Sequence, residues 1–274
     1  MINKLDFPRQ WQLQPASLST LPAPALTDLR DLLAQFNPIS LAEMDGVALL
    51  SRTDTKYVLN RHQLMAVLVT LPHYYRILEI KQVRLNQYQT LYFDTPGFDL
   101  YLAHHAGRRN RVKVRSREYV DTHRSFLEIK QKTNKDQTIK HRLPTTGFMT
   151  CMTPETDEFL YSQSPATPLN LEPKLSNNFS RLTLVSLYRP ERLTLDVQLQ
   201  FAAADQTVTL PSIVIAEVKQ AGHIPDSDFI RQMRAMKIQP MGFSKYCMGV
   251  SLLYPQVKHN NFKPKLRWLN KLMH

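Results

Sequence analysis

The stretch Arg111-Val112-Lys113-Val114-Arg115-Ser116-Arg117 has a cation at every second position and small or apolar residues between them. Successive side chains of a β-strand point to opposite faces, so this stretch predicts a strand with all four cations on one face. Similar strips recur at Arg52-Thr-Asp54-Thr-Lys56, Glu128-Ile-Lys130-Gln-Lys132, Thr138-Ile-Lys140-His-Arg142, Arg192-Leu-Thr-Leu-Asp196 and Ile215-Ala-Glu217-Val-Lys219. The sequence therefore predicts a sheet with one cationic face.

A sheet face that only meets water alternates in the same way, so alternation alone does not indicate function. Such a face normally mixes charge signs, because like charges opposite each other destabilise a sheet. Two cations about 6 Å apart repel by roughly 3 kcal/mol at an effective dielectric constant near 20. The acids on these strips are few: Asp54, Glu128, Asp196 and Glu217. We therefore favour an anion-binding face over a solvated one.

The composition supports a folded protein with an acidic partner. The chain has 274 residues, of which 43% are hydrophobic, and a formal net charge of +12. This hydrophobic fraction excludes a disordered polycation. The charge predicts binding to nucleic acid, a phosphate-rich metabolite or an anionic membrane surface, and does not by itself distinguish them.

Two cysteines, Cys151 and Cys247, are too few for a disulfide framework and have no metal-ligand spacing. No apolar stretch has the length of a membrane span, and the N-terminus does not resemble a signal peptide. We expect a cytoplasmic location.

Three regions follow from the distribution of proline, charge and periodicity. We expect residues 1–25 to form a Pro-containing arm. We expect residues 26–255 to form one domain and residues 256–274 to form a basic tail. In the tail, Phe262, Leu266, Leu269 and Met273 recur at helical spacing. This segment predicts either a helix that docks on the domain or one that binds a membrane surface or a membrane protein.

Strands outnumber helices in the predicted domain. We expect helices at 26–36, 39–50 (with Ser40 as N-cap and Glu43 three residues later), 63–71, 226–236 and 244–253, and within 154–178. We expect strands near 52–59, 76–84, 87–94, 110–119, 124–132, 137–143, 179–188, 191–201 and 212–220. This order predicts an α+β protein built on an antiparallel barrel or curved sheet.

Common catalytic motifs are missing from the sequence. It contains no Gly-x-x-x-x-Gly-Lys-Ser/Thr loop and no Gly-x-Gly-x-x-Gly, which argues against a P-loop or dinucleotide fold. Nucleic acid is a poor candidate, because single-strand binders interleave stacking aromatics with cations, and Phe126 is the clearest aromatic on these strips. Phosphoryl transfer, in contrast, requires positioned cations and a divalent metal. Glu128 and Glu217 could each serve as a salt-bridge partner or as a ligand of Mg²⁺ or Mn²⁺.

A set of short motifs resembles the VTC domain, the polyphosphate-polymerase branch of the triphosphate tunnel metalloenzymes. The matching segments, in the order of that family, are Arg52-Thr-Asp-Thr-Lys56-Tyr57, Thr90-Leu-Tyr-Phe-Asp94-Thr, Arg108-Arg-Asn-Arg111-Val-Lys113-Val-Arg115, Leu127-Glu128-Ile-Lys130, Arg192-Leu-Thr-Leu-Asp196, Ala216-Glu217-Val-Lys219 and Ser244-Lys245-Tyr246. Related CYTH proteins begin with Glu-x-Glu-x-Lys. Here the first acid is replaced by Arg52, which favours the VTC branch over a two-metal triphosphatase.

The resemblance implies a closed antiparallel β-barrel, a tunnel with a basic lumen and helices outside it. It also implies a metal-dependent phosphotransferase that binds a nucleoside triphosphate and polyphosphate. The implied catalytic residues are Lys56, Lys113, Arg115, Lys130, Arg192 and Lys245. The substrate-binding candidates are Lys140, Arg181, Arg189 and Lys219, together with Arg52, Arg111 and Lys132 from the cationic strips. Glu217, with Glu128 as a further candidate, would bind Mn²⁺ or Mg²⁺. A triphosphate or tripolyphosphate hydrolase and a non-catalytic polyphosphate-binding module are the alternatives.

Overall fold

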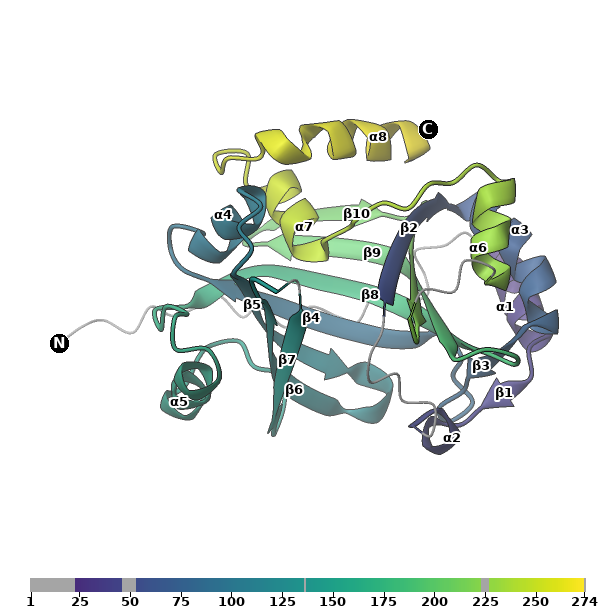
Figure 1. Ribbon diagram of the computed structural model, residues 1–274, viewed down its shortest axis with the longest axis horizontal. Coiled ribbons are helices and arrows are strands. Elements are labelled where there is room, and N and C mark those ends of the chain that lie inside the picture. Colours follow the sequence, from purple (N-terminus) through teal and green to yellow (C-terminus); the bar gives the residue numbers. More distant parts are fainter. Residues whose placement is uncertain (1–22, 46–52, 136, 223–226, 274) are drawn as a thin grey trace.

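The computed structural model describes residues 23–45, 53–135, 137–222 and 227–273. Its strands form one 11-stranded sheet in which every pair except β1–β3 is antiparallel (Figure 1), so the predicted α+β class is confirmed. The strands are β1 Pro38–Ile39, β2 Thr53–Asn60, β3 Tyr75–Leu78, β4 Asn86–Asp94, β5 Arg111–Tyr119, β6 Arg124–Lys132, β7 Thr138–Thr145, β8 Glu172–Ser186, β9 Glu191–Ala203, β10 Gln206–Leu210 and β11 Ile213–Gln220.

Eight α-helices accompany the sheet in the described ranges: α1 Ala23–Ala34, α2 Leu41–Asp45, α3 Arg61–Thr70, α4 Asp99–His105, α5 Pro154–Gln163, α6 Asp228–Ala235, α7 Lys245–Leu253 and α8 Lys263–Met273. The predicted cap at Ser40 is confirmed, because Glu43 N–H donates to Ser40 Oγ and Ser40 N–H donates to Glu43 Oε2. The helix predicted over 39–50 is described only to Asp45, and its remainder lies outside the described residues. No helix in the described ranges is long and apolar enough to cross a membrane.

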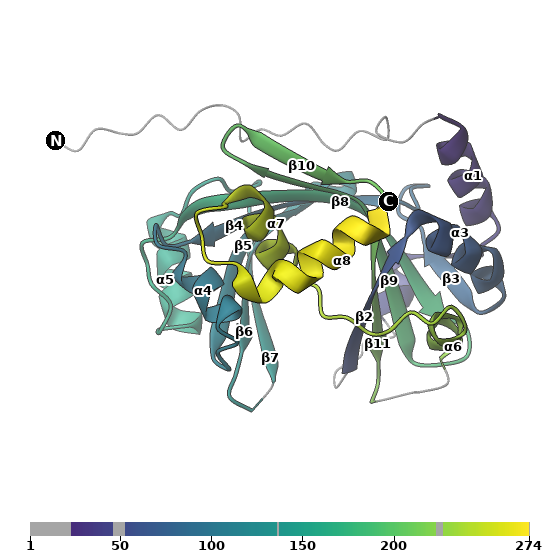
Figure 2. The same ribbon diagram turned by 90° about the horizontal axis from the view of Figure 1, so that it is seen from above.

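The closed barrel expected from the resemblance is not what the hydrogen bonding shows. The ladder runs β2-β11-β9-β8-β4-β5-β6-β7, and the described parts of β2 and β7 do not pair with each other. Lys56 on β2 and Lys140 and Arg142 on β7 are all in the interior charge clusters described below, so closure would place like charges opposite each other. In Figure 2, β2 and β11 turn to the same side of the central strands as β5, β6 and β7 do. The result is a strongly curved open sheet.

The convex face of the sheet is apolar, as the alternation of residues requires. Beside the cations of β5 and β6, Val114, Leu127 and Ile129 point outward and pack with Leu160 of α5. At the other end of the sheet, α1, α3 and α6 cover the outward side chains of β2, β9 and β11. Burial of these side chains holds the strands in the register that gathers the cations on the concave face.

Among the described elements, α7 and α8 fill one end of the concave face. Val58 and Ile215, which lie on the same face as the cations of β2 and β11, pack in one cluster with Met248 of α7 and Leu269 of α8. Figures 1 and 2 show α7 on the concave side of the sheet and α8 lying across it. The remaining concave surface carries the charged side chains.

The tail predicted at 256–274 forms α8, and its apolar face packs on the domain. Leu269 is buried, and Leu266, Trp268, Leu272 and Met273 are partly buried against the same cluster. Of the two predictions for this segment, the structure supports docking on the domain, and it gives no support to the membrane-surface alternative.

Candidate functional site

The register of β5, β6 and β7 brings their cations together on the concave face. Lys113 lies opposite Lys130, which lies opposite Lys140 on the next strand. One step along the strands, Arg115 lies opposite Glu128, which lies opposite Arg142. The predicted convergence of alternate residues therefore holds across three neighbouring strands.

Glu128 is the centre of one charge cluster. Its side chain is 0% exposed and its carboxylate lies 2.6 Å from Arg115, 2.5 Å from Lys140 and 2.9 Å from Arg142. Burial alone would raise the pKa of Glu128, but Arg115, Arg117 and Lys140 hold it well below the ordinary value. Both carboxylate oxygens accept from cations, so Glu128 neutralises the strand cations around it.

Asp196 of β9 forms a second cluster. Arg181 of β8 grips its carboxylate with two hydrogen bonds of 2.5 and 2.8 Å, and Lys245 at the start of α7 also donates to it. Burial would raise the pKa of Asp196, but Arg181 and Lys245 lower it to about 2. Lys245 Nζ also lies 3.9 Å from the centre of the Phe179 ring, a cation–π contact.

Glu217 of β11 forms a third cluster, between Lys56 on β2 and Lys219 on its own strand. Lys56 donates to Oε1, and Lys219 Nζ lies 2.6 Å from Oε2 and 3.4 Å from Asp54. These lysines hold the pKa of Glu217 well below its ordinary value, against the opposing effect of burial. Among the described residues no group of three or more His, Cys, Asp or Glu could hold a metal ion. Glu217 and Asp54 both contact Lys219, so these two carboxylates are candidates to share a hard cation with ligands from outside the chain.

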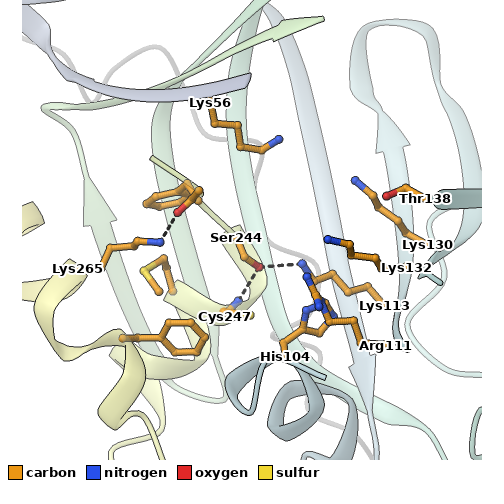
Figure 3. A pocket seen from close by; sticks show the side chains of 15 residues that line it. Lys56, His104, Arg111, Lys113, Lys130, Lys132, Thr138, Ser244, Cys247 and Lys265 are labelled. Atoms are coloured by element: carbon orange, nitrogen blue, oxygen red, sulfur yellow. Dashed lines mark hydrogen bonds between the residues drawn. The ribbon is translucent and has the colours of Figure 1, made fainter. Parts of the chain in front are cut away.

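A cavity of about 350 Å³ lies beside the Glu217 cluster, whose Lys56 lines it. It is bounded on one side by β5 and β6 and on the other by α7 and α8 (Figure 3). Four of its cations form no ion pair with a described carboxylate. Arg111 donates to the Arg108 carbonyl, Lys113 to Ser244 Oγ at 2.9 Å and Lys265 to the Gly242 carbonyl, and Lys130 forms no hydrogen bond with a described residue. The cavity thus holds positive charge that the described carboxylates do not neutralise.

The first turn of α7 lines the same cavity. Ser244 is the N-cap of this helix, since its hydroxyl accepts from Cys247 N–H at 3.2 Å. The N-terminus of a helix carries a partial positive charge and unpaired amide groups, which favours anions. Backbone and side chains therefore give the cavity the same sign of potential.

The pKa values of the cavity side chains reflect this crowding of charge. Burial and the neighbouring Lys56 lower the pKa of Lys130 to about 8, and burial also lowers the pKa of Lys113. His104 lies on the cavity wall, where burial, Lys113 and Arg111 lower its pKa to about 2, so its imidazole is neutral. A bound anion would relieve the repulsion among these groups.

Most of the residues predicted for the site lie in these clusters or on the cavity wall. Lys132 also lines the cavity, and Arg192 lies beside Lys219 in the β9–β11 pairing. Arg189 lies in the turn between β8 and β9, beyond the strand ends. Arg52 lies outside the described residues.

The sequence prediction omitted several residues of the site. Asp196 was visible as an acid on a cationic strip, and Ser244 stands next to Lys245 in the matched motif, but neither was predicted to have a role. Arg142, which pairs with Glu128, was visible only as an alternate residue of its strip. Lys265 carried no signal, because its position depends on how the tail helix packs.

The matched family agrees with this arrangement. The VTC domain model matches residues 51–254, which is most of the chain, so the protein belongs to the VTC domain family. No curated protein matches the sequence at a significant level.

Solved structures of low sequence identity align with most of this chain. A candidate adenylate cyclase from Bacillus halodurans is 12% identical over 73% of this chain and 96% of its own, with a TM-score of 0.44. A candidate adenylyl cyclase from Hippeastrum, described as having a dominant triphosphatase activity, is 12% identical over 73% and 96%, with a TM-score of 0.46. A conserved hypothetical protein from Pyrococcus furiosus is 12% identical over 70% and 98%, with a TM-score of 0.39.

Proposed function

We propose that this chain is a metal-dependent phosphotransferase of the polyphosphate-polymerase type. It would bind a nucleoside triphosphate and a polyphosphate chain in the cavity between β5–β6 and α7–α8. The observation that carries the proposal is a group of four cations around this cavity, Arg111, Lys113, Lys130 and Lys265. Within the part of the chain that the structure describes, they have neutral hydrogen-bond partners or none. Membership of the VTC family supports the same reading.

The arrangement suits phosphoryl transfer because this reaction depends on positioning and on charge stabilisation. An oxygen of the terminal phosphate of the chain would attack the γ-phosphorus of the nucleotide. The bond from that phosphorus to the bridging oxygen would break, and the nucleoside diphosphate would leave with the electron pair. Lys113 and Lys130 would hold the phosphates, and Arg115 and Lys245, anchored on Glu128 and Asp196, would stabilise the charge that spreads over the transferred group.

The carboxylates allow one role for a divalent metal. Mg²⁺ and Mn²⁺ sites in phosphotransferases commonly take one or two carboxylates and complete their shell with phosphate oxygens and water. Glu217, 15% exposed and beside Asp54, fits that description. Cations contact both oxygens of Glu217 and both oxygens of Glu128. Glu128 does not fit a metal site because its side chain is 0% exposed. When bound, the metal would neutralise charge on the phosphate oxygens.

The direct test is a phosphorus NMR time course of the protein with ATP and Mn²⁺ or Mg²⁺. We expect ADP and a growing signal from internal phosphates of polyphosphate. The matched variants are Glu217→Gln, which should abolish the reaction, and Glu155→Gln in the first turn of α5, which should not change it. Orthophosphate without chain growth would indicate a hydrolase, and binding without turnover under either metal would indicate a polyphosphate-binding module. Either result would overturn the proposal.

A further inference from the structure

A cation from the C-terminal helix lies on the wall of the cavity. Lys265 belongs to α8, which follows the region matched by the family model, residues 51–254. Its side chain is partly buried and lines the cavity together with Lys113 and Lys130. In Figure 3, Lys265 lies on the side opposite Lys130, with the cavity between them.

Several contacts fix the position of α8. The ring of Phe262, just before the helix, makes an edge contact with His105, with ring centres 5.5 Å apart. Asn261 N–H donates to His105 Nε2 at 3.2 Å, and the side chain of Asn261 donates to the His105 carbonyl at 2.8 Å. Farther along, Leu269 is 2% exposed in the cluster that includes Ile215 of β11. The helix is thus held at both ends, on α4 and on the β2–β11 arm of the sheet.

The partial burial of Lys265 distinguishes it from the other cations of the helix. Lys263, Arg267 and Lys271 are exposed to solvent, whereas Lys265 is partly buried and burial lowers its pKa. Its one hydrogen bond to a described residue is to a neutral acceptor, the Gly242 carbonyl. Placing a further cation at a cavity that already holds Arg111, Lys113 and Lys130 is unfavourable unless an anion binds between them.

We propose that Lys265 is a phosphate-binding residue and that α8 forms one wall of the binding site for the end of a linear phosphate chain. This inference rests on the proposed function, in which the cavity binds phosphates. It extends the site beyond the family-matched region and assigns the tail a role in holding the substrate. The ligand class is an inorganic tripolyphosphate or a longer polyphosphate, whose spaced negative charges can reach both walls at once.

The test compares Lys265→Gln with Lys271→Gln, a matched change of an exposed lysine on the same helix. The affinity of each protein for inorganic tripolyphosphate is measured by isothermal titration calorimetry at one fixed salt concentration. We expect Lys265→Gln to bind about tenfold more weakly than wild type, Lys271→Gln to bind like wild type, and Lys265→Arg to retain most of the affinity. Equal affinities for Lys265→Gln and Lys271→Gln would overturn the proposal.

A second measurement uses the wild-type protein, so it does not depend on the folding of a variant. Lysines are acetylated with and without tripolyphosphate, and the extent of modification is read by mass spectrometry. Tripolyphosphate should protect Lys265 and leave Lys271 unprotected, and equal modification of Lys265 in both samples would contradict the proposal.

Failure of the proposed function would give a different result from failure of the role of Lys265. If the wild type binds no tripolyphosphate, the cavity is not a phosphate site at all. If the wild type binds tripolyphosphate, and Lys113→Gln weakens this binding while Lys265→Gln does not, only the role of Lys265 is wrong.

Discussion

Lys113 of β5 donates a 2.9 Å hydrogen bond to the hydroxyl of Ser244, the residue that caps α7. One hydroxyl thus joins the cationic strand to the helix whose first residue, Lys245, pairs with Asp196. The contact couples the stability of α7 to the geometry of the cavity.

Replacing Ser244 by alanine should therefore have two effects. Loss of the N-cap should lower the free energy of unfolding by about 1 kcal/mol, because the Cys247 amide loses its acceptor. Binding of tripolyphosphate should also weaken, because Lys113 loses the partner that orients it. Urea unfolding and calorimetry measure the two quantities.

The matched control is Thr153→Ala, which removes the N-cap of α5. Helix α5 packs on the convex face of the sheet, so this variant should lose a similar free energy of unfolding and keep the affinity for tripolyphosphate. An equal loss of affinity in both variants would show that the effect reflects general destabilisation.

Glu128→Gln should be strongly destabilising. It leaves Arg115, Lys140 and Arg142 without their buried counter-charge, and breaking a buried ion pair in this way typically costs about 3 kcal/mol or more. The comparison is Glu172→Gln, whose partner is Lys174 and whose side chain is 45% exposed, for which we expect at most about 1 kcal/mol. Denaturant unfolding of both variants measures the difference, and equal losses would contradict the role of Glu128 as the centre of its cluster.

The affinity for phosphate should fall as the pH rises through about 8. Lys130 has its pKa lowered to about 8 by burial and by Lys56, so it loses its charge above that pH in the free protein. A bound anion favours the charged form, hence binding takes up a proton above pH 8 and weakens as the pH increases. The contribution of Lys130 to the free energy of unfolding has the opposite pH dependence. Between about pH 8 and its ordinary pKa, the lysine binds more protons in the unfolded chain, so its contribution to stability rises with pH.

Lys130→Arg isolates this effect, because arginine remains charged over the whole range. Calorimetric titrations with tripolyphosphate at pH 7 and pH 9 should show a larger loss of affinity for wild type than for the variant. Protonation of the tripolyphosphate itself affects both proteins equally, so it does not contribute to the difference between them. The same loss in both proteins would exclude Lys130 as the titrating group.

The alternation of cations predicted much of this architecture, because a period of two specifies both the strand and its two faces. Strands β5, β6, β7, β9 and β11 lie close to their predicted positions, and their cations share the concave face. Periodicity did not predict the elements whose secondary structure depends on tertiary packing. The start of β8 contains Ser176, Asn177 and Asn178, a polar run without alternation, and was predicted to be helix or loop. Helix α4 has seven residues and no side-chain cap, so it gave no signal.

The pairing of acids with cations in the site could also not be predicted from the sequence. Alternation places residues on a face, but it does not say which acid on a neighbouring strand neutralises which cation. The register pairs Glu128 with Arg115 and Arg142, and tertiary packing brings Lys245 to Asp196. The cations without such partners could therefore be identified only from the structure.

The central claim is that a phosphate chain binds in the cavity between β5–β6 and α7–α8. A crystal structure of the protein with tripolyphosphate tests it most directly. We predict phosphate density within hydrogen-bonding distance of Lys113 and Lys130, with a terminal phosphate beside Lys265. Tripolyphosphate bound on the convex face of the sheet, with this cavity filled only by water, would contradict it.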